Sequence, residues 1–267
     1  MGLTSNQGFH WIDKPLEGIF GERLNRFACS VTIAGSATKV YLPNSGRLEE
    51  LLRPGARVIV EKRRQSGKTH HDLLLIETSR YPEGEPIWAA LDSRLPPKLL
   101  GWAIRQGLIK DLPTLADQRA EPAIPSGRLD LKLSYEGLDH YIETKSVNLV
   151  DQSGLARFPD APTRRGQRHL QELINLKAQG HQASLVFIVV RHDPLGLAPF
   201  VERDPAFSQA LVEAERAGVP IHAYKFKAEP TVHYRGSIPV NLDPDPFPGY
   251  WPPMQAGPGA HLRSHNP

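Results

Sequence analysis

The segment from Ser126 to Lys145, SGRLDLKLSYEGLDHYIETK, constrains the fold of this chain more than any other part of its sequence. It contains two runs of alternating apolar and polar residues, with Gly137 at the break, where a glycine allows a tight turn. Successive strand side chains point to opposite faces, so Glu143 and Lys145 share one face of the second run, opposite Thr144 and Ile142. In the first run, Asp130 lies opposite three leucines that share the other face, Leu129, Leu131 and Leu133. We therefore expect a hairpin in which Asp130 faces Glu143 and Lys145.

The acids of this hairpin suit metal-assisted cleavage of a phosphodiester. A pair of carboxylates supplies hard oxygen ligands, and Mg²⁺ or Mn²⁺ is the cation that such a pair, completed by water and phosphate, prefers. Lys145 would orient the attacking water or stabilise the phosphate as a point charge. The alternative is a surface hairpin with ordinary solvated Asp130, Glu143 and Lys145, because an acid followed at a distance by Glu-x-Lys is a short pattern.

Length and composition indicate a folded protein of two domains. The chain has 267 residues, and a domain takes about 150. Cys29 is its only cysteine, which excludes a disulfide within the chain and a cysteine-based metal cage and favours a reducing compartment. The sequence has no run of eighteen apolar residues and no apolar run at its start. We expect a cytoplasmic protein that does not enter a membrane, with a mild formal charge of +3.

The first half of the sequence predicts a small β-barrel over residues 20–80, preceded by an N-terminal arm over residues 1–19. Its apolar or β-branched runs are separated by turn signals, as in a five-stranded OB-like barrel, a fold that commonly binds single-stranded nucleic acid. The runs are Phe27–Ile33, Thr38–Leu42, Ala56–Arg64 and Asp72–Thr78.

Basic residues and one turn make this barrel a candidate nucleic-acid surface. The turn Asn44-Ser45-Gly46-Arg47 presents backbone N–H groups, and Arg47 would add a phosphate contact; a simple hairpin or helix-start turn explains it equally well. The other candidates for phosphate contact are Arg26, Lys62 and Arg63. A solvated charge cluster is the alternative for these.

A Pro/Gly-rich linker over residues 81–88 leads to a second domain over residues 89–240, and residues 241–267 read as a Pro-rich tail. Helices and strands alternate in this domain, which predicts an α/β or α+β fold with a mixed sheet. The predicted elements, beyond the hairpin, are helices at Pro97–Gln106 and Asp204–Gly218 and strands at Ala183–Val190 and Ile221–Phe226. Asp204 is placed to cap its helix, with Pro205 in the first turn.

An arginine-rich helix start follows the hairpin, within Ala156–Gly180. Its basic residues are Arg157, Arg164, Arg165 and Arg168. A helix N-terminus favours phosphate through its free N–H groups and dipole, and the arginines reinforce that preference. Gln167 and His169 lie in the same turn, where surface positions are the alternative for both.

Motifs in the same order and spacing resemble the sugar fermentation stimulation protein family, from about Phe20 to Val240. They are Tyr41–Leu48 (YLPNSGRL), Gly127–Asp130 (GRLD), Tyr141–Val147 (YIETKSV), Arg157–Ala161 (RFPDA), Arg165–Leu173 (RGQRHLQEL) and Val189–Asp193 (VVRHD). The resemblance implies an OB-like domain and a restriction-endonuclease-like domain similar to the PD-(D/E)xK nuclease superfamily. It also implies that Asp130, Glu143 and Lys145 match the nuclease core and that Gln167 matches a polar position on the following helix. We expect Asp130, Glu143 and the backbone carbonyl of Thr144 to be the metal ligands.

Two departures from the family pattern leave two hypotheses open. Arg164 stands where the family pattern has a glutamate, and the helix Pro97–Gln106 brings no acid to the site. The resemblance favours a DNA-binding protein linked to regulation of sugar (maltose) metabolism genes, acting on duplex or single-stranded DNA and with a homodimer left open. The alternative is an active Mg²⁺-dependent nuclease.

Overall fold

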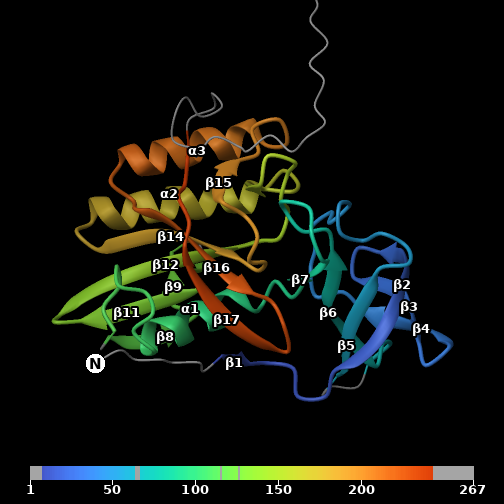
Figure 1. Ribbon diagram of the computed structural model, residues 1–267. Coiled ribbons are helices and arrows are strands. Elements are labelled where there is room, and N and C mark those ends of the chain that lie inside the picture. Colours follow the sequence, from blue (N-terminus) through green and yellow to red (C-terminus); the bar gives the residue numbers. More distant parts are fainter. Residues whose placement is uncertain (1–7, 64–66, 115, 126, 243–267) are drawn as a thin grey trace, which may run out of the picture.

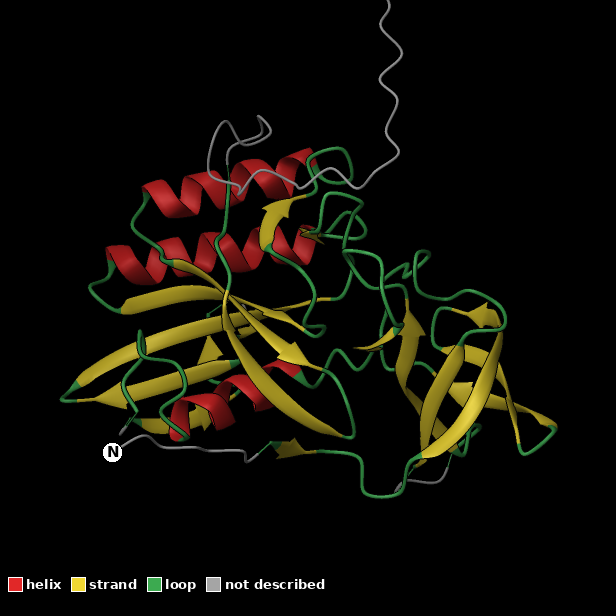
Figure 2. Ribbon diagram, viewed as in Figure 1, coloured by secondary structure: helices red, strands yellow, loops and turns green. Residues whose placement is uncertain are grey.

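The computed structural model describes residues 8–63, 67–114, 116–125 and 127–242, which form two domains side by side (Figure 1). One is a small β-barrel, and the other is a mixed sheet covered by helices (Figure 2). Both match the predicted fold class. Ser126, at the start of the predicted hairpin, and all but the first two residues of the predicted tail lie outside the described residues.

The N-terminal domain is a six-stranded sheet with the strand order β4-β3-β2-β5-β6-β7, in which neighbours in this order are antiparallel and the closing pair β4–β6 is parallel. The pairing of Tyr41 on β4 with Asp72 on β6 closes five of these strands into a barrel. Its strands are β2 (Leu16–Asn25), β3 (Ala28–Ile33), β4 (Ser36–Tyr41), β5 (Arg57–Lys62), β6 (His71–Thr78) and β7 (Ile87–Ala90). Buried side chains from β2 to β7, such as Phe20, Val40 and Leu73, fill the barrel.

The barrel is longer in sequence than predicted, because β2 begins inside the expected arm and β7 runs from the expected linker into the expected second domain. Two glycines interrupt the apolar pattern of β2, and glycine is rare within strands. At Gly18 the fold requires one, since a Cβ there would come within 2.6 Å of the Val31 side chain and 2.9 Å of the Thr32 carbonyl oxygen. Close packing against β3 thus requires a glycine within β2, and this glycine makes the strand hard to recognise from the sequence.

The C-terminal domain is a seven-stranded mixed sheet with the strand order β1-β17-β16-β14-β12-β11-β8. Helix α1 covers one face, and α2 and α3 lie together on the other (Figure 1). The helices are α1 (Pro96–Arg105), α2 (Arg164–Ala178) and α3 (Pro205–Arg216). The sheet strands are β1 (Phe9–His10), β8 (Asp117–Ala120), β11 (Leu131–Tyr135), β12 (Leu138–Val147), β14 (Gln182–Val189), β16 (Ile221–Lys227) and β17 (Thr231–Ser237). None of the helices in the described ranges is long and apolar enough to cross a membrane.

Strand β14 runs through the centre of this sheet and is buried on both faces, as its continuous apolar sequence predicts. Leu185, Phe187 and Val189 pack under α2 and α3. Val186 and Ile188 pack toward α1. The sheet is therefore the middle layer of three.

The predicted hairpin is present as β11 and β12, but its first strand starts after Asp130. Leu131 and Leu133 pack in the core on the α1 side, whereas Leu129 packs in the core under α2. The prediction that the three leucines share a face was therefore wrong for Leu129. The chain bends at Asp130, between the short strand β10 (Gly127–Arg128) and β11, and the bend breaks the alternation.

The N-terminal segment links both domains and is no separate arm. Its strand β1 pairs with β17 at the edge of the C-terminal sheet, and Ile12 is fully buried in the core on the α1 side. The remaining strands form two small ribbons, β9 (Ala123–Ile124) with β10, and β13 (Leu155–Phe158) with β15 (Gly196–Pro199).

The polar residues that follow β14 anchor the linker. Arg191 forms a buried ion pair with Asp193 at 2.6 Å and donates a hydrogen bond to the Ser79 carbonyl oxygen at 2.9 Å. Asp193 accepts from the Tyr81 backbone N–H at 2.9 Å. These contacts join the end of the barrel domain to the C-terminal sheet.

Candidate functional site

A cleft with a volume of about 570 Å³ lies between the two domains. The barrel contributes the turns around Arg26 and Asn44, and the C-terminal domain contributes the end of β12 and the segment that leads into α2. Five basic side chains line it against three acidic ones, namely Arg26, Lys145, Arg157, Arg164 and Arg165 against Asp130, Glu143 and Asp160. The cleft joins the sequence-predicted acids to several of the predicted basic residues.

Asp130 is held against β12 by Thr144. The register that pairs Leu131 with Ile142 brings Asp130 next to Glu143 and Thr144. The Thr144 backbone N–H and hydroxyl both donate to Asp130 Oδ2, at 2.9 and 2.5 Å. Burial, and then the negative charge of Glu143, raise the pKa of Asp130 against the opposing effect of these hydrogen bonds. The expected role of the Thr144 carbonyl oxygen as a metal ligand stays a prediction.

Glu143 is buried at 3% exposure beneath α2 and is held by two basic side chains. Lys145 Nζ lies 2.6 Å from Glu143 Oε1, and His169 Nδ1 contacts the same oxygen. Burial alone would raise the pKa of Glu143, but the hydrogen bond from His169 and the charge of Lys145 outweigh it and lower the pKa. Glu143 is thus favoured as a carboxylate.

The other oxygen of this carboxylate, Glu143 Oε2, is buried and has no hydrogen-bond partner within the described residues. A buried carboxylate oxygen left unpaired is costly unless a cation or another donor satisfies it. With Asp130 beside it, this oxygen fits a hard divalent cation. The described part of the chain contains no group of three or more His, Cys, Asp or Glu side chains arranged to hold a metal, so waters and substrate would complete the coordination.

The start of α2 forms one wall of the cleft. Thr163 caps the helix by accepting from the Gly166 N–H at 2.9 Å, and Arg164 and Arg165 are exposed in the first turn. Arg165 Nε donates to His169 Nε2 at 3.4 Å. Because this nitrogen accepts, Nδ1 carries the proton that faces Glu143. Arg165, His169, Glu143 and Lys145 thus form one connected chain.

Gln167 and Arg168 do not join this cluster. Gln167 Nε2 lies 3.3 Å from Oδ1 of Asp204, the residue that caps α3, and Arg168 is exposed and does not line the cleft. The polar side chain of α2 that contacts the acidic pair is therefore His169, not Gln167 as expected. His169 lies three residues after Gly166 and four before Leu173, both buried, so the helical period turns it toward the sheet and Gln167 toward α3.

The barrel contributes only part of its predicted set. Arg26, Asn44 and Ser45 line the cleft, whereas Arg47 does not. Asn44 shapes the turn, because its Oδ1 accepts from the Gly46 N–H at 2.8 Å and its Nδ2 donates to the Leu91 carbonyl oxygen at 2.9 Å.

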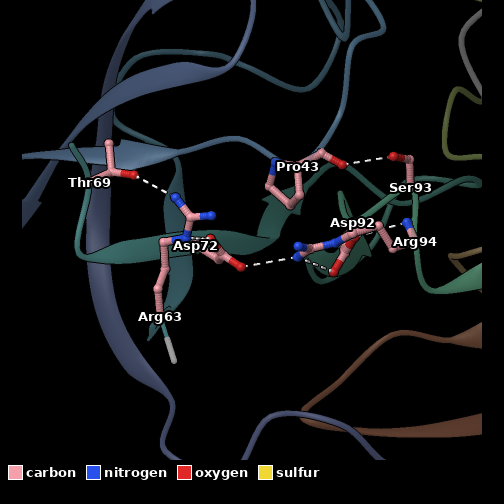
Figure 3. Close-up of polar contacts among 7 residues, drawn as sticks. All are labelled: Pro43, Arg63, Thr69, Asp72, Asp92, Ser93 and Arg94. Atoms are coloured by element: carbon pink, nitrogen blue, oxygen red, sulfur yellow. Dashed lines mark hydrogen bonds and ion pairs between the residues drawn. The ribbon is translucent and has the colours of Figure 1, made fainter. Parts of the chain in front are cut away.

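Lys62 and Arg63 line a different cleft, of about 500 Å³, between the barrel and the N-terminal segment. Arg63 Nε pairs with Asp72 Oδ1 at 2.9 Å, and Asp72 Oδ2 accepts from Arg94 Nη2 at 3.0 Å (Figure 3). Arg94 also pairs with Asp92 at 2.8 Å. Alternating charges in this row neutralise one another, so Arg63 is anchored and is no free cation.

Sequence reasoning missed the role of two residues. His169, for which a surface position was the alternative, is buried at 4% exposure on Glu143; its place in the apolar stripe of α2 was the available signal. Asp160, from the RFPDA motif, accepts from the Leu48 backbone N–H of the barrel at 3.2 Å. No pattern within the sequence predicts a contact between two residues that are 112 positions apart.

Comparison with known proteins agrees with this architecture. Residues 94–232 match the family described as the sugar fermentation stimulation protein RE domain, and residues 22–85 match the SfsA N-terminal OB domain. A solved structure described as Pyrococcus furiosus SfsA in complex with Ca²⁺ superposes with a TM-score of 0.78 at 29% identity, covering 88% of this chain and 99% of that one.

Curated relatives extend the similarity along the sequence. The sugar fermentation stimulation protein homolog of Natranaerobius thermophilus is 41% identical over 238 residues, which are 87% of this chain and 96% of the relative. That of Moorella thermoacetica is 39% identical over 231 residues, 85% of this chain and 97% of the relative. With both domains matched in order, the chain belongs to the sugar fermentation stimulation protein family.

Proposed function

We propose that this protein binds DNA in the cleft between its two domains. The observation that carries the proposal is that Arg26 of the barrel and Arg164 of α2 line one cleft, are exposed, and form no ion pair within the described residues. Free guanidinium groups recognise phosphate oxygens with two parallel hydrogen bonds. The N-terminus of α2 adds N–H groups and a positive dipole on the same side.

Two of the other three cationic groups of the cleft form ion pairs, and the third, Arg165, donates a hydrogen bond to His169, whereas Arg26 and Arg164 have neither contact among the described residues. Arg157 pairs with Asp151 at 2.5 Å, and Lys145 pairs with Glu143. Binding through Arg26 and Arg164 would be insensitive to base sequence, because phosphate contacts position a nucleic acid without reading it.

Fluorescence anisotropy with labelled DNA tests this function. Arg26→Ala and Arg164→Ala should each weaken binding severalfold, and together by roughly tenfold or more, because each removes a phosphate contact. Arg216→Ala is the matched control, since Arg216 is exposed in the last turn of α3 and does not line the cleft. Equal affinity of the double variant and the wild type would exclude this cleft, and absence of binding by the wild type would refute the function.

A second candidate function is metal-dependent hydrolysis of a phosphodiester, favoured by the unpaired buried oxygen Glu143 Oε2. Asp130 and Glu143 would hold the cation, with the Thr144 carbonyl oxygen as a third ligand. A bound Mg²⁺ or Mn²⁺ would activate a water and neutralise charge on the phosphate. Lys145 would hold its positive charge beside the attacked phosphate, and His169 would keep Glu143 oriented. The Ca²⁺ complex of the Pyrococcus furiosus relative supports a divalent ion in this family.

Incubation with supercoiled, linear and single-stranded DNA in Mg²⁺ or Mn²⁺ tests the second function. Cleavage by the wild type that disappears in Asp130→Ala and Lys145→Ala would support it. No cleavage by the wild type at saturating metal would rule it out while leaving DNA binding intact.

The finer biological proposal is that DNA binding regulates genes of sugar metabolism, including maltose use. Its support is the name of the relatives, sugar fermentation stimulation protein homolog. Transcripts of sugar-use genes should change in a strain whose chromosomal copy carries Arg26→Ala and Arg164→Ala. Unchanged transcripts in that strain would contradict regulation through this cleft.

A further inference from the structure

Four side chains on the barrel are neighbours in a row, in the order Arg26, Phe27, Tyr41 and Arg63. The Phe27 and Tyr41 rings lie 6.2 Å apart at an interplanar angle of 22°. The Arg26 guanidinium lies 5.3 Å from the Phe27 ring centre, and that of Arg63 lies 4.5 Å from the Tyr41 ring centre. At 6.2 Å the two nearly parallel rings are offset and not face to face, so part of the exposed Phe27 ring is left for a nucleic-acid base to stack on.

Phe27 is exposed at 42% although it is large and apolar, and its backbone is held in place. Its N–H donates to Asn25 Oδ1 at 2.9 Å, and its carbonyl oxygen accepts from the Leu42 N–H at 2.9 Å. The backbone that carries the ring is therefore fixed before any ligand arrives, which lowers the entropy lost on binding.

The row is joined to the candidate DNA cleft. Arg23 donates to the Arg26 carbonyl oxygen at 2.8 Å and to the carbonyl oxygens of Gly46 and Arg47 at 2.7 and 2.6 Å. It thereby ties the turn that carries Phe27 to the turn that lines the cleft. Arg26, at one end of the row, lines that cleft, and Arg63, at the other end, lines the second cleft.

Charge decides which partner this exposed ring suits. An apolar protein interface would have to bury the Arg26 guanidinium, which forms no ion pair within the described residues, and burying an unpaired charge is unfavourable. A nucleic acid offers phosphate to Arg26 and a base face to Phe27 at the same time. The base must be unpaired, because bases in a duplex are already stacked on their neighbours.

We propose that Phe27 stacks on an unpaired base of a DNA strand whose phosphates lie in the interdomain cleft, so that the protein prefers single-stranded DNA to duplex. This proposal rests on the DNA-binding function proposed above. Phe27 would be the barrel residue that makes the cleft prefer single-stranded DNA to duplex.

Anisotropy with an oligodeoxythymidylate of about 12 nucleotides, a length within the range that OB folds cover, and with a duplex of equal length tests the proposal. Phe27→Ala should weaken single-strand binding by roughly 5- to 150-fold, the loss expected for one stacked base. Phe27→Trp should restore it, and duplex affinity should not change. The matched control is Leu138→Ala, because Leu138 is 58% exposed on the other domain.

A second measurement reports stacking directly and does not depend on the affinity. Fluorescence of 2-aminopurine placed in the single strand should be quenched in the wild-type complex and recover in the Phe27→Ala complex. If the wild type binds DNA but Phe27→Ala binds the single strand equally well, or weakens duplex binding to the same extent, the stacking proposal fails alone. If the wild type binds no DNA of either form, the proposed function fails with it.

Discussion

Glu143 is the residue on which the chemistry of the cleft depends, because its two carboxylate oxygens have opposite surroundings. Oε1 is held by Lys145 and His169, and Oε2 is buried without a partner in the described chain. A protein seldom buries half of a carboxylate unsatisfied, and such an oxygen is a candidate ligand for a cation or a substrate group. The sequence predicted Glu143 and Lys145 from strand alternation but could not predict His169 as their partner, since that contact depends on how α2 is docked.

The first prediction concerns metal binding by Glu143. Addition of Mn²⁺ at about a hundred times its dissociation constant should stabilise the wild type by about 2.7 kcal/mol. Glu143→Gln should show little of this gain, because the amide removes the charge that attracts the cation, while Glu202→Gln, which alters an exposed residue, should keep it. Thermal unfolding with and without metal measures the effect. An equal gain in Glu143→Gln would place any metal elsewhere.

The second prediction concerns His169. Its replacement by alanine removes a buried hydrogen bond to a carboxylate, so the free energy of unfolding should fall by about 1–3 kcal/mol. Arg168→Ala, one residue away but exposed, should leave stability within about 0.5 kcal/mol of the wild type. Urea unfolding followed by circular dichroism compares the variants. A fully stable His169→Ala protein would show that Glu143 does not need this partner.

At the scale of elements, sequence patterns predicted strands and helices correctly where local preferences, such as helix capping, agree with the packing of the fold. Asp204 caps α3 by accepting from the Phe207 N–H at 2.9 Å, with Pro205 in the first turn, as its sequence predicts. The pattern failed where tertiary packing overrides local rules. Gly18 weakens the pattern of β2 but is required by close contact with β3, and the bend at Asp130 moves Leu129 into the other core.

The third prediction concerns the pairing of β12 with β14. His140 on β12 bonds to Ser184 Oγ at 2.9 Å, and burial, then the nearby His222 and Lys177, lower the pKa of His140 to about 4. Between pH 4 and about 6.5 the unfolded chain therefore binds a proton that the folded protein does not. Stability should fall as the pH falls through this window, by up to about 3 kcal/mol from this residue.

His140→Gln should reduce that loss, since glutamine does not titrate and keeps a polar group near Ser184. Urea unfolding at pH 7 and pH 4.5 measures the difference between the two conditions. His70→Gln, at an exposed histidine, is the control and should behave as the wild type does. A variant at residue 140 that loses as much stability as the wild type would contradict the assignment.

At the scale of the whole molecule, the cleft exists because the two domains are fixed to each other. Asp160 accepts from the Leu48 N–H, and Arg203 donates to the Asp160 carbonyl oxygen and to Glu50, both at 3.0 Å. The sequence predicted two domains and their fold classes, but it offered no signal for their relative placement. Arg47 and Lys62 were therefore expected at the phosphates, although the domain arrangement leaves both outside the main cleft.

The fourth prediction concerns this junction. A Cβ at Gly46 would overlap Asp160 Oδ2, so Gly46→Ala should displace Asp160 and cost about 1–2 kcal/mol through the lost hydrogen bond to Leu48. Gly84→Ala is the control, because its nearest neighbour would lie at 3.6 Å. Unfolding free energies of the two variants decide the matter. If Gly46→Ala were as stable as Gly84→Ala, the contact between Asp160 and Leu48 would not contribute to stability.

The salt dependence of DNA affinity tests the central claim, that DNA lies in the interdomain cleft, most directly. For a duplex, the slope of log affinity against log salt concentration should be steep in the wild type and shallower by about 0.9 for each phosphate contact removed. Arg26→Ala combined with Arg164→Ala should therefore reduce the slope by nearly 2, whereas Arg216→Ala should not change it. A double variant with the slope and affinity of the wild type would contradict the claim.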